Sequence, residues 1–319
     1  MNSAHEPVDL RRVRTRSIAE RPSKVAREDL GRPVAEGATV RELVDSLPRQ
    51  LAAVDLREFL EAWRSARRRG RAMLALFGAH VVKCGLGPVV VDLVRRGYVT
   101  AIGLNGAGAI HDTELALWGK TSEDVAQGLA TGMFGMAEET AAFLNEAARR
   151  AARERRGLGE MLGALIRERA PEAGSTSLLA ACHERGVPLT VHVALGTDVV
   201  HQHPSADGAA IGESTFRDFR LLASVVSGLH DGGLVLHAGS AVLLPEVFLK
   251  ALTVARNVGG PVDGFVAANL DFVRQYRPLE NVVTRPTAGT GRGYNFVGHH
   301  EIMLPLMAAA LRQMDSVTA

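Results

Sequence analysis

The chain has 319 residues, of which 46% are hydrophobic and 5% aromatic, enough to bury a sizeable core in a globular, enzyme-sized protein. Its 37 basic and 35 acidic residues nearly cancel, which argues against nucleic acid as a partner. No stretch approaches the ~20 apolar residues of a membrane span, and the start lacks the apolar segment of a secretion signal. We therefore expect a cytoplasmic protein with no membrane partner.

The first 34 residues differ in composition from the rest of the chain. Seven basic residues lie between positions 11 and 27, with few apolar residues to anchor them. Such a segment cannot bury enough apolar surface to fold by itself. We expect a basic, flexible arm over residues 1–34 and a single α/β domain over residues 35–319.

The rest of the chain shows alternating strand and helix patterns. Two helices are expected to begin after Thr39 and Asp55, and Gly70 ends the second. Strands are predicted at 72–77, 99–104, 189–195, 234–237 and 264–268. Helices are predicted at 85–96, from about 109 through 169 with breaks near 157 and 159, and at 177–185, 213–229, 245–257 and 301–314. This order predicts a Rossmann-like, doubly wound parallel sheet with a helical extension at its N-terminus.

Small or polar residues follow the predicted strands and a further apolar run before position 298. Because parallel strands end at one edge of the sheet, where open α/β folds bind ligands, we expect these residues to meet in one cleft. The segments are Gly78 to His80, Asn105 to Gly108, Gly196 to Asp198, Ala238 to Ser240 and Gly298 to His300.

The segment from Asn105 to Asp112 is the most specific of these. Its small residues allow backbone N–H groups to approach a phosphate or ribose, and the following helix directs its positive N-terminus to the same place. The spacing is not the G-x-G-x-x-G fingerprint, and such a turn can also serve only to redirect the chain. A second glycine-rich segment, residues 286–293, lacks the Gly-Lys-Ser/Thr of a P-loop and is expected to be a lid or a linker.

Seven of the 11 histidines lie at or just after these strand ends, so the cleft is expected to be rich in groups that titrate near neutrality. His201 and His203, with Asp198 nearby, could bind zinc or iron. The same groups serve equally well in hydrogen bonding or proton transfer. We favour the second interpretation and expect no metal.

The two cysteines, Cys84 and Cys182, are too few for a disulfide framework and fit a reducing compartment. Lys83 precedes Cys84 and could activate its thiol. We nevertheless expect Cys84 to be a buried, inert thiol.

The succession of segments from about Ala72 to Leu311 resembles the deoxyhypusine synthase superfamily. His80 to Gly85 is similar to that family's first NAD-contacting turn. Asn105 to Asp112 is similar to its Thr-Ala-Gly-Gly…Glu segment, which places Asp112 where the family has a ribose-binding acid. Asn269 falls near its Asn-Thr-Ala element, and Gly298 with His299 replaces an Asp-Ala pair.

The resemblance implies NAD as the cofactor and a homo-oligomer, a tetramer with sites shared between subunits. The basic arm would then cover a neighbouring cleft. The cofactor-binding residues that it implies are Gly78, His80, Asn105, Gly106, Ala107, Gly108, Asp112, Thr197, Asp198, Gly239, Ser240, Asn269, Gly298 and His299.

Residues 105–119 are also similar to the Gly-Asn-Ala…Val-His-Asp-Ile-Glu-Tyr-Ala-Leu-Tyr-Gly segment of the NAD-dependent ornithine cyclodeaminases of archaea and cyanobacteria. Both families oxidise a carbon that bears nitrogen to an imine and use NAD as a recycled catalyst. The resemblance therefore implies the same chemistry here.

One departure from deoxyhypusine synthase is decisive. That family carries its intermediate on a lysine in a Trp-Gly-Lys element, whereas this chain has Val283-Thr284-Arg285-Pro286 there and no lysine after Lys250. Arginine stays protonated and cannot form the imine. A true deoxyhypusine synthase is therefore not expected.

The favoured hypothesis is an NAD-dependent, redox-neutral transferase or lyase that acts on a small amine, amino acid or polyamine-like substrate. His203 or His300 would transfer protons. Glu246 and Asp271 would orient the substrate, and Lys83 would stabilise charge or form a covalent imine. Two alternatives stay open. The first is a metal-dependent hydrolase or lyase that uses His201 and His203, and the second is a non-catalytic homologue that binds NAD.

Overall fold

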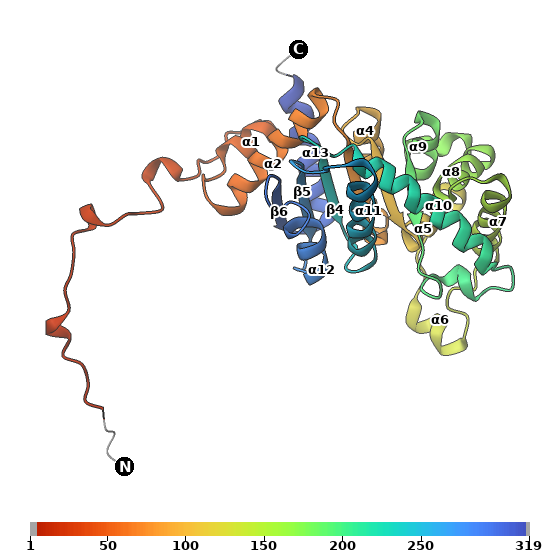
Figure 1. The fold of residues 1–319 in the computed structure, drawn as a ribbon, viewed down its shortest axis with the longest axis horizontal. Helices are drawn as coiled ribbons and strands as arrows, with labels where there is room; N and C mark the ends of the chain where they lie inside the picture. The colour runs from red at the N-terminus through yellow and green to blue at the C-terminus, as the bar shows by residue number, and fades with distance from the viewer. Residues whose placement is uncertain (1–4, 317–319) are drawn as a thin grey trace.

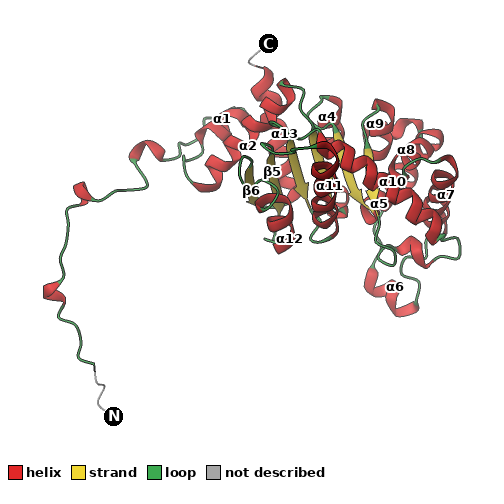
Figure 2. Cartoon of the chain, in the orientation of Figure 1, coloured by secondary structure: helices red, strands yellow, loops and turns green. Residues whose placement is uncertain are grey.

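The computed structural model describes residues 5–316 and contains one six-stranded sheet in which all strands are parallel. Its strand order is β3-β2-β1-β4-β5-β6, a Rossmann-like arrangement with helices on both faces (Figures 1 and 2). The strands are β1 (Met73–Phe77), β2 (Ala101–Asn105), β3 (Leu189–His192), β4 (Leu234–Ala238), β5 (Val266–Asp271) and β6 (Arg292–Val297). The predicted fold class is confirmed.

Thirteen α-helices lie within the described residues. They are α1 (Val40–Ser46), α2 (Leu51–Arg68), α3 (Ala79–Lys83), α4 (Gly87–Arg95), α5 (Gly106–Trp118), α6 (Val125–Thr131), α7 (Glu138–Glu154), α8 (Leu158–Arg169), α9 (Leu178–Arg185), α10 (Gly208–Ser227), α11 (Leu243–Gly259), α12 (Tyr276–Pro278) and α13 (His300–Ser316). A π-helical turn, Leu279–Thr284, follows α12. None of these helices is long and apolar enough to cross a membrane.

Apart from the partly exposed edge strand β6, the strands are buried on both faces, as expected for a parallel sheet covered by helices. In β1, Met73 and Phe77 join the core formed with α2, α4 and α13, whereas Leu74 and Leu76 join the core under α10 and α11. Successive side chains of a strand point to opposite faces, so one apolar run supplies both cores.

Several predicted boundaries differ from the structure. Asp55 lies inside α2, because the guanidinium of Arg57 bonds the carbonyls of Val44, Leu47 and Pro48 and fixes the turn before Leu51. Helix α10 begins at Gly208 rather than near 213, since the Asp207 carboxylate accepts from the backbone N–H groups of Ala209 and Ala210 in its first turn. The second glycine-rich segment leads into β6, for which no bounds were predicted.

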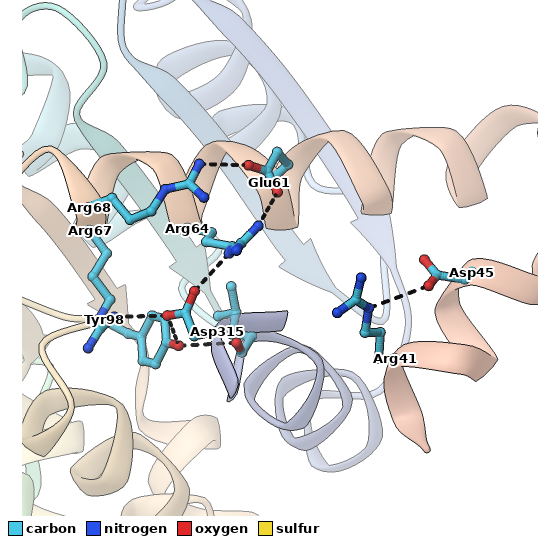
Figure 3. A network of polar contacts seen from close by, with 9 residues as sticks. Arg41, Asp45, Glu61, Arg64, Arg67, Arg68, Tyr98 and Asp315 are labelled. Atoms are coloured by element: carbon cyan, nitrogen blue, oxygen red, sulfur yellow. Dashed lines mark hydrogen bonds and ion pairs between the residues drawn. The ribbon is translucent and has the colours of Figure 1, made fainter. Parts of the chain in front are cut away.

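The N-terminal helices α1 and α2 belong to the body of the domain. Trp63 donates to the carbonyl of Tyr98 at 2.7 Å. Asp315, in the last turn of α13, accepts from Arg64 at 2.7 Å, from Arg67 at 2.8 Å and from the hydroxyl of Tyr98 (Figure 3). The network connects α2, the segment before β2, and α13, so it fixes the predicted helical extension to the sheet.

Residues 5–34 extend away from this body (Figure 1). They contain three short 3₁₀ turns, and almost all of their side chains are exposed. Backbone hydrogen bonds from Arg32 to Ser46 and from Arg49 to Asp29 attach the end of the arm to α1 and its flanks. 

Asp218 links α10 to α8 and β3. Its environment predicts that the stability of the protein depends on pH. Its buried carboxylate accepts from the backbone N–H groups of Gly159 at 2.9 Å and Val191 at 2.8 Å. Burial, opposed by these two bonds, raises the pKa of Asp218 to about 7. The folded state therefore holds this proton more tightly than the unfolded state, and the stability that Asp218 contributes is lost as pH rises from about 4 to about 7.

We expect Asp218→Asn, which stays neutral, to lack this dependence. Urea unfolding of both proteins at pH 5 and pH 7 would show wild-type stability falling relative to the variant by a few kcal/mol at the higher pH. Comparison with the variant cancels the opposite contribution of His192, whose pKa is lowered to about 3 by burial. A constant difference between the two proteins would contradict the prediction.

Candidate functional site

The sheet order reverses between β1 and β4, and the two strands end in glycine turns that touch. The N–H of Gly78 donates to the carbonyl of Ala238 at 2.8 Å. A Cβ on Gly78 would overlap the carbonyl oxygen of Gly239 and lie 2.9 Å from the nitrogen of Ser240. Gly239 itself has a φ of 73°, in the left-handed region. Such a reversal forms the ligand-binding crevice of doubly wound sheets.

Histidine and aromatic rings surround this point. His300, the first residue of α13, is buried, and its Nε2 lies 3.1 Å from the carbonyl oxygen of Leu270 and 3.8 Å from a carboxylate oxygen of Asp271. Its ring lies 5.4 Å from that of His80. Burial lowers the pKa of His300, so its neutral form is favoured. The Nδ1 atom of His300 has no hydrogen-bond partner within the described chain.

A row of polar side chains, of which His237 and Asn269 are buried and Asn295 is partly buried, crosses the sheet beside the crevice. Strand register aligns His237, Asn269 and Asn295 on β4, β5 and β6. His237 Nδ1 contacts Asn269 Oδ1 at 2.7 Å, and Asn269 donates to Asn295 Oδ1 at 2.9 Å. The predicted cofactor residue Asn269 is therefore bonded within the sheet. His237 and Asn295 lacked a predicted role, because only strand register shows that they align.

The turn before α5 differs from the expected phosphate cradle. Asn105 Oδ1 accepts from the N–H of Gly108 at 2.9 Å, and the N–H of Ala107 bonds Asp198. A Cβ on Gly106 would lie 2.8 Å from Asp198 Cγ, so glycine is needed there for the carboxylate. Burial raises the pKa of Asp198 to about 6, and the Ala107 N–H opposes this shift. Backbone donors that were expected to hold a phosphate thus bind side chains of the protein.

Asp112 also has a different environment from the expected ribose contact. Its carboxylate is buried and accepts from the Ser177 hydroxyl at 2.6 Å, from Leu178 N–H at 2.8 Å and from Leu179 N–H at 3.0 Å. Both oxygens are therefore bonded to the first turn of α9. The expected role of Asp112 as a ribose contact is therefore corrected. The physical cause is that its carboxylate supplies acceptors to N–H groups that lack partners inside the helix.

A cleft of about 830 Å³ opens beside this turn, between α3, α5, the segment around α6, and the loop after β3. Four of the predicted site residues line it, namely Lys83, Ala107, Thr197 and Asp198. Residues that had not been singled out as site residues also line it, including His111, Glu114, Lys120, Thr121, Glu123 and Glu139. The start of α5 touches α3, because a Cβ on Gly108 would lie 3.7 Å from the Ala79 backbone. The cleft and the crevice are thus neighbours.

Hydrogen bonds order one wall of the cleft. His111 Nδ1 lies 2.6 Å from the Thr121 hydroxyl, which also bonds Glu114. The second oxygen of Glu114 accepts from Thr140 at 2.8 Å. These contacts position a carboxylate and an imidazole toward the same space. His111 and Glu114 lie on one face of α5 at the i, i+3 spacing, which was the available sequence signal.

Other predicted residues lie apart from this cleft. His203 Nε2 is 2.8 Å from the carbonyl oxygen of Gly135, while His201 Nδ1 accepts from the N–H groups of Gly196 and Asp198. Among residues 5–316, the group of side chains close enough to share a metal ion does not include these two histidines. Within that range, His201 and His203 therefore do not meet the third ligand that the alternative metal site would need.

The carboxylate of Glu246 already interacts with residues of α11 and of the segment after β5. Its carboxylate bonds Lys250, accepts from Asn281 at 2.8 Å and lies 3.3 Å from Arg277. It was expected to be available for a cationic substrate, but these donors from its own chain occupy it.

In the segment before α13, Gly298 packs against the helix and His299 is exposed to solvent. A Cβ on Gly298 would lie 2.8 Å from Met303 Cγ, so glycine allows the close approach. His299 is exposed and stacks on Phe272 with ring centres 6.1 Å apart.

Cys84 is less buried than was expected, and its inertness stays a prediction. It is partly exposed, and its Sγ lies 3.2 Å from His80 Nε2. Burial, followed by the nearby Glu301 carboxylate, raises the pKa of Cys84. Cys182 is fully buried in α9, and burial raises its pKa. The four-residue spacing of His80 and Cys84 was the sequence signal for their contact, but Glu301 comes from a distant part of the chain.

The fold and the crevice define an α/β protein of the Rossmann-like class. No family model and no curated protein matches the sequence. Among solved structures, AgrE in its ternary complex with ornithine and NAD+ has a TM-score of 0.54 and 15% identity, over 83% of this chain and 33% of that one.

Two further structures match with TM-scores of 0.49. ArgZ, an arginine dihydrolase from the ornithine-ammonia cycle in cyanobacteria, is 18% identical over 82% of this chain and 31% of its own. An Entamoeba histolytica protein provisionally named a deoxyhypusine synthase is 12% identical over 88% and 95%. The chain thus spans about a third of AgrE and ArgZ, and the likeness to these solved structures is one of fold.

Proposed function

We propose that this chain is an NAD-dependent transferase or lyase that acts on a small amine, amino acid or polyamine-like molecule. The observation that carries the proposal is the cleft of about 830 Å³ at the carboxyl edge of the sheet, which lies within the size range of ligand sites. It contains lysines and carboxylates together, so it can bind a ligand that carries both charges. AgrE, whose fold is similar, was solved with ornithine and NAD+, which are ligands of the proposed classes.

The residues present fit a dinucleotide at the crevice. The buried Nδ1 of His300 and Nε2 of His237 have no hydrogen-bond partner in the described chain, so both are available to a ligand. Lys83 lines the adjoining cleft and supplies positive charge for a pyrophosphate. The chemistry that NAD supplies when bound is acceptance of a hydride from the carbon bearing the substrate nitrogen, which leaves an imine.

The side chains of the cleft have separate tasks in this proposal. The carboxylate of Glu139 attracts and orients a cationic amine, while Glu114 and Glu123, which already accept hydrogen bonds from Thr121, Thr140 and Gly135, add negative charge around it. With a pKa of about 6, Asp198 is largely ionised near neutrality and accepts a proton from the substrate nitrogen. We propose a redox-neutral overall reaction, in which the hydride is returned within each turnover.

NAD binding is the first test. At a concentration 100 times its Kd, NAD should stabilise the full chain by about 2.7 kcal/mol and raise Tm by roughly 5 °C. Lys83→Ala should weaken NAD binding about tenfold, since a charged hydrogen bond to phosphate is lost. Lys250→Ala is the matched control, because Lys250 is an exposed lysine paired with Glu246 on α11.

A thermal-shift titration of the three proteins decides between the outcomes. Absence of any shift with NAD would overturn the cofactor assignment. Equal effects of the two lysine substitutions would show that the cleft does not hold the phosphates. Incubation of the NAD-loaded protein with a panel of amines and amino acids, followed by mass spectrometry of the products, then tests the substrate class.

A further inference from the structure

Two elements distant in sequence bring three metal-ligating side chains together. His80 lies on α3 and Cys84, one turn further along, is the C-cap residue of that helix, while Glu301 lies in the first turn of α13. The Cys84 Sγ is 3.2 Å from His80 Nε2, and one ligand atom from each of the three residues lies within 4.8 Å of the other two. No described group of histidine, cysteine and carboxylate side chains elsewhere converges in this way.

The donor set is typical of zinc. Zinc binds thiolate sulfur at about 2.3 Å and imidazole nitrogen or carboxylate oxygen at about 2.0–2.2 Å, in tetrahedral geometry. Ligand atoms of such a site are therefore roughly 3.3–3.8 Å apart. The distance from Cys84 Sγ to His80 Nε2 is just below this range and every other pair lies within 4.8 Å, so small side-chain rotations bring all three atoms onto one ion. A mixed nitrogen, sulfur and oxygen set argues against magnesium or calcium, which prefer oxygen.

We propose that His80, Cys84 and Glu301 bind one zinc ion and leave its fourth position open to water or substrate. His80 and Glu301 are exposed and Cys84 is partly exposed, so the ion can enter from solvent. Three protein ligands with an open position are typical of catalytic rather than structural zinc. This inference does not rest on the proposed NAD chemistry.

Surrounding contacts hold the ligands in place. The His80 ring lies 5.8 Å from Phe272 and 5.4 Å from His300, and the two packed rings restrict its rotation. His300, which precedes Glu301, contacts the carbonyl oxygen of Leu270 at 3.1 Å and fixes the start of α13. The N–H of Cys84 donates to the carbonyl of His80 at 2.9 Å, which sets the spacing of these two ligands. Outer contacts of this kind orient metal ligands.

The proposed zinc site lies next to the turn that borders the ligand crevice. A Cβ on Gly239 would lie 3.7 Å from His80 Cβ, so the ligand set borders the turn where the sheet order reverses. A zinc ion there would act as a Lewis acid on an oxygen or nitrogen of a molecule bound at the carboxyl edge.

The test is titration of metal-free, reduced full-length protein with Co²⁺, followed by displacement with Zn²⁺. One equivalent of Co²⁺ should produce a near-ultraviolet sulfur-to-cobalt band together with the intense visible bands of tetrahedral cobalt, and zinc should abolish them. Cys84→Ser should remove the sulfur band, and His80→Ala and Glu301→Gln should each weaken cobalt binding by tenfold or more.

Matched controls separate the site from unspecific thiol or histidine binding. Cys182→Ser removes the buried cysteine of α9, and His183→Ala removes an exposed histidine of the same helix that is not in the ligand set. Both controls should bind cobalt as wild type does. Circular dichroism checks that each variant folds. Binding well below one equivalent in wild type, or a sulfur band that survives Cys84→Ser, would overturn the proposal.

Discussion

Replacing Gly78 with alanine is expected to destabilise the protein by more than about 3 kcal/mol. The added Cβ would overlap the carbonyl oxygen of Gly239, which is backbone and cannot rotate away. The strands β1 and β4 would have to separate at their carboxyl ends, where Gly78 N–H also bonds Ala238. Urea unfolding of the wild type and variant measures the loss directly.

Gly212→Ala is the matched control for this substitution. Gly212 lies inside α10, and a Cβ there would meet no atom within 4 Å. Alanine should therefore stabilise the protein by about 0.5–1 kcal/mol, because it lowers the entropy cost of forming the helix. If Gly78→Ala were as well tolerated as Gly212→Ala, that result would contradict the close contact between the ends of β1 and β4.

Removing the carboxylate of Asp112 has the second large expected effect. Asp112→Ala should reduce the free energy of unfolding by about 3–5 kcal/mol, because Leu178 N–H, Leu179 N–H and the Ser177 hydroxyl lose buried acceptors. The same substitution should leave NAD affinity unchanged in protein that remains folded, since the carboxylate faces α9. Chemical denaturation measures the first effect and calorimetry with NAD the second.

The control is Asp124→Ala, which removes an exposed N-terminal cap of α6. Asp124 accepts one hydrogen bond, from Gln127 N–H at 2.9 Å. Its loss should cost only about 1 kcal/mol. A small stability effect of Asp112→Ala combined with a large loss of NAD affinity would instead support the role that the family resemblance implied, a ribose contact.

Local signals in the sequence determined much of the fold. Short β-rich runs followed by helical patterns predicted the alternation that the parallel sheet confirms. Thr39 caps α1 as its side chain suggested, and Ser177, expected to be the first residue of a helix, is the N-cap of α9. Such features depend on neighbouring residues alone, because capping and hydrophobic periodicity act within a few positions of the chain.

The strand-end residues were predicted to lie at one edge, and the sheet order places them there. The role of each residue at that edge could not be predicted from the sequence. Asn105 and Asp112 have the residue types of ligand contacts, yet both bond backbone N–H groups. A polar side chain takes the buried donor that packing brings to it, and that donor can belong to a helix far away in sequence.

The cap of α1 and the alternation of strands and helices were thus determined by local sequence. Tertiary structure decided the addition of β6 as an edge strand, the contact of Gly78 with Gly239, and the meeting of Cys84 with Glu301 across more than 200 positions. The physical reason is common to all three. Burial, register and close approach depend on which distant segments pack together, and no local pattern carries that information.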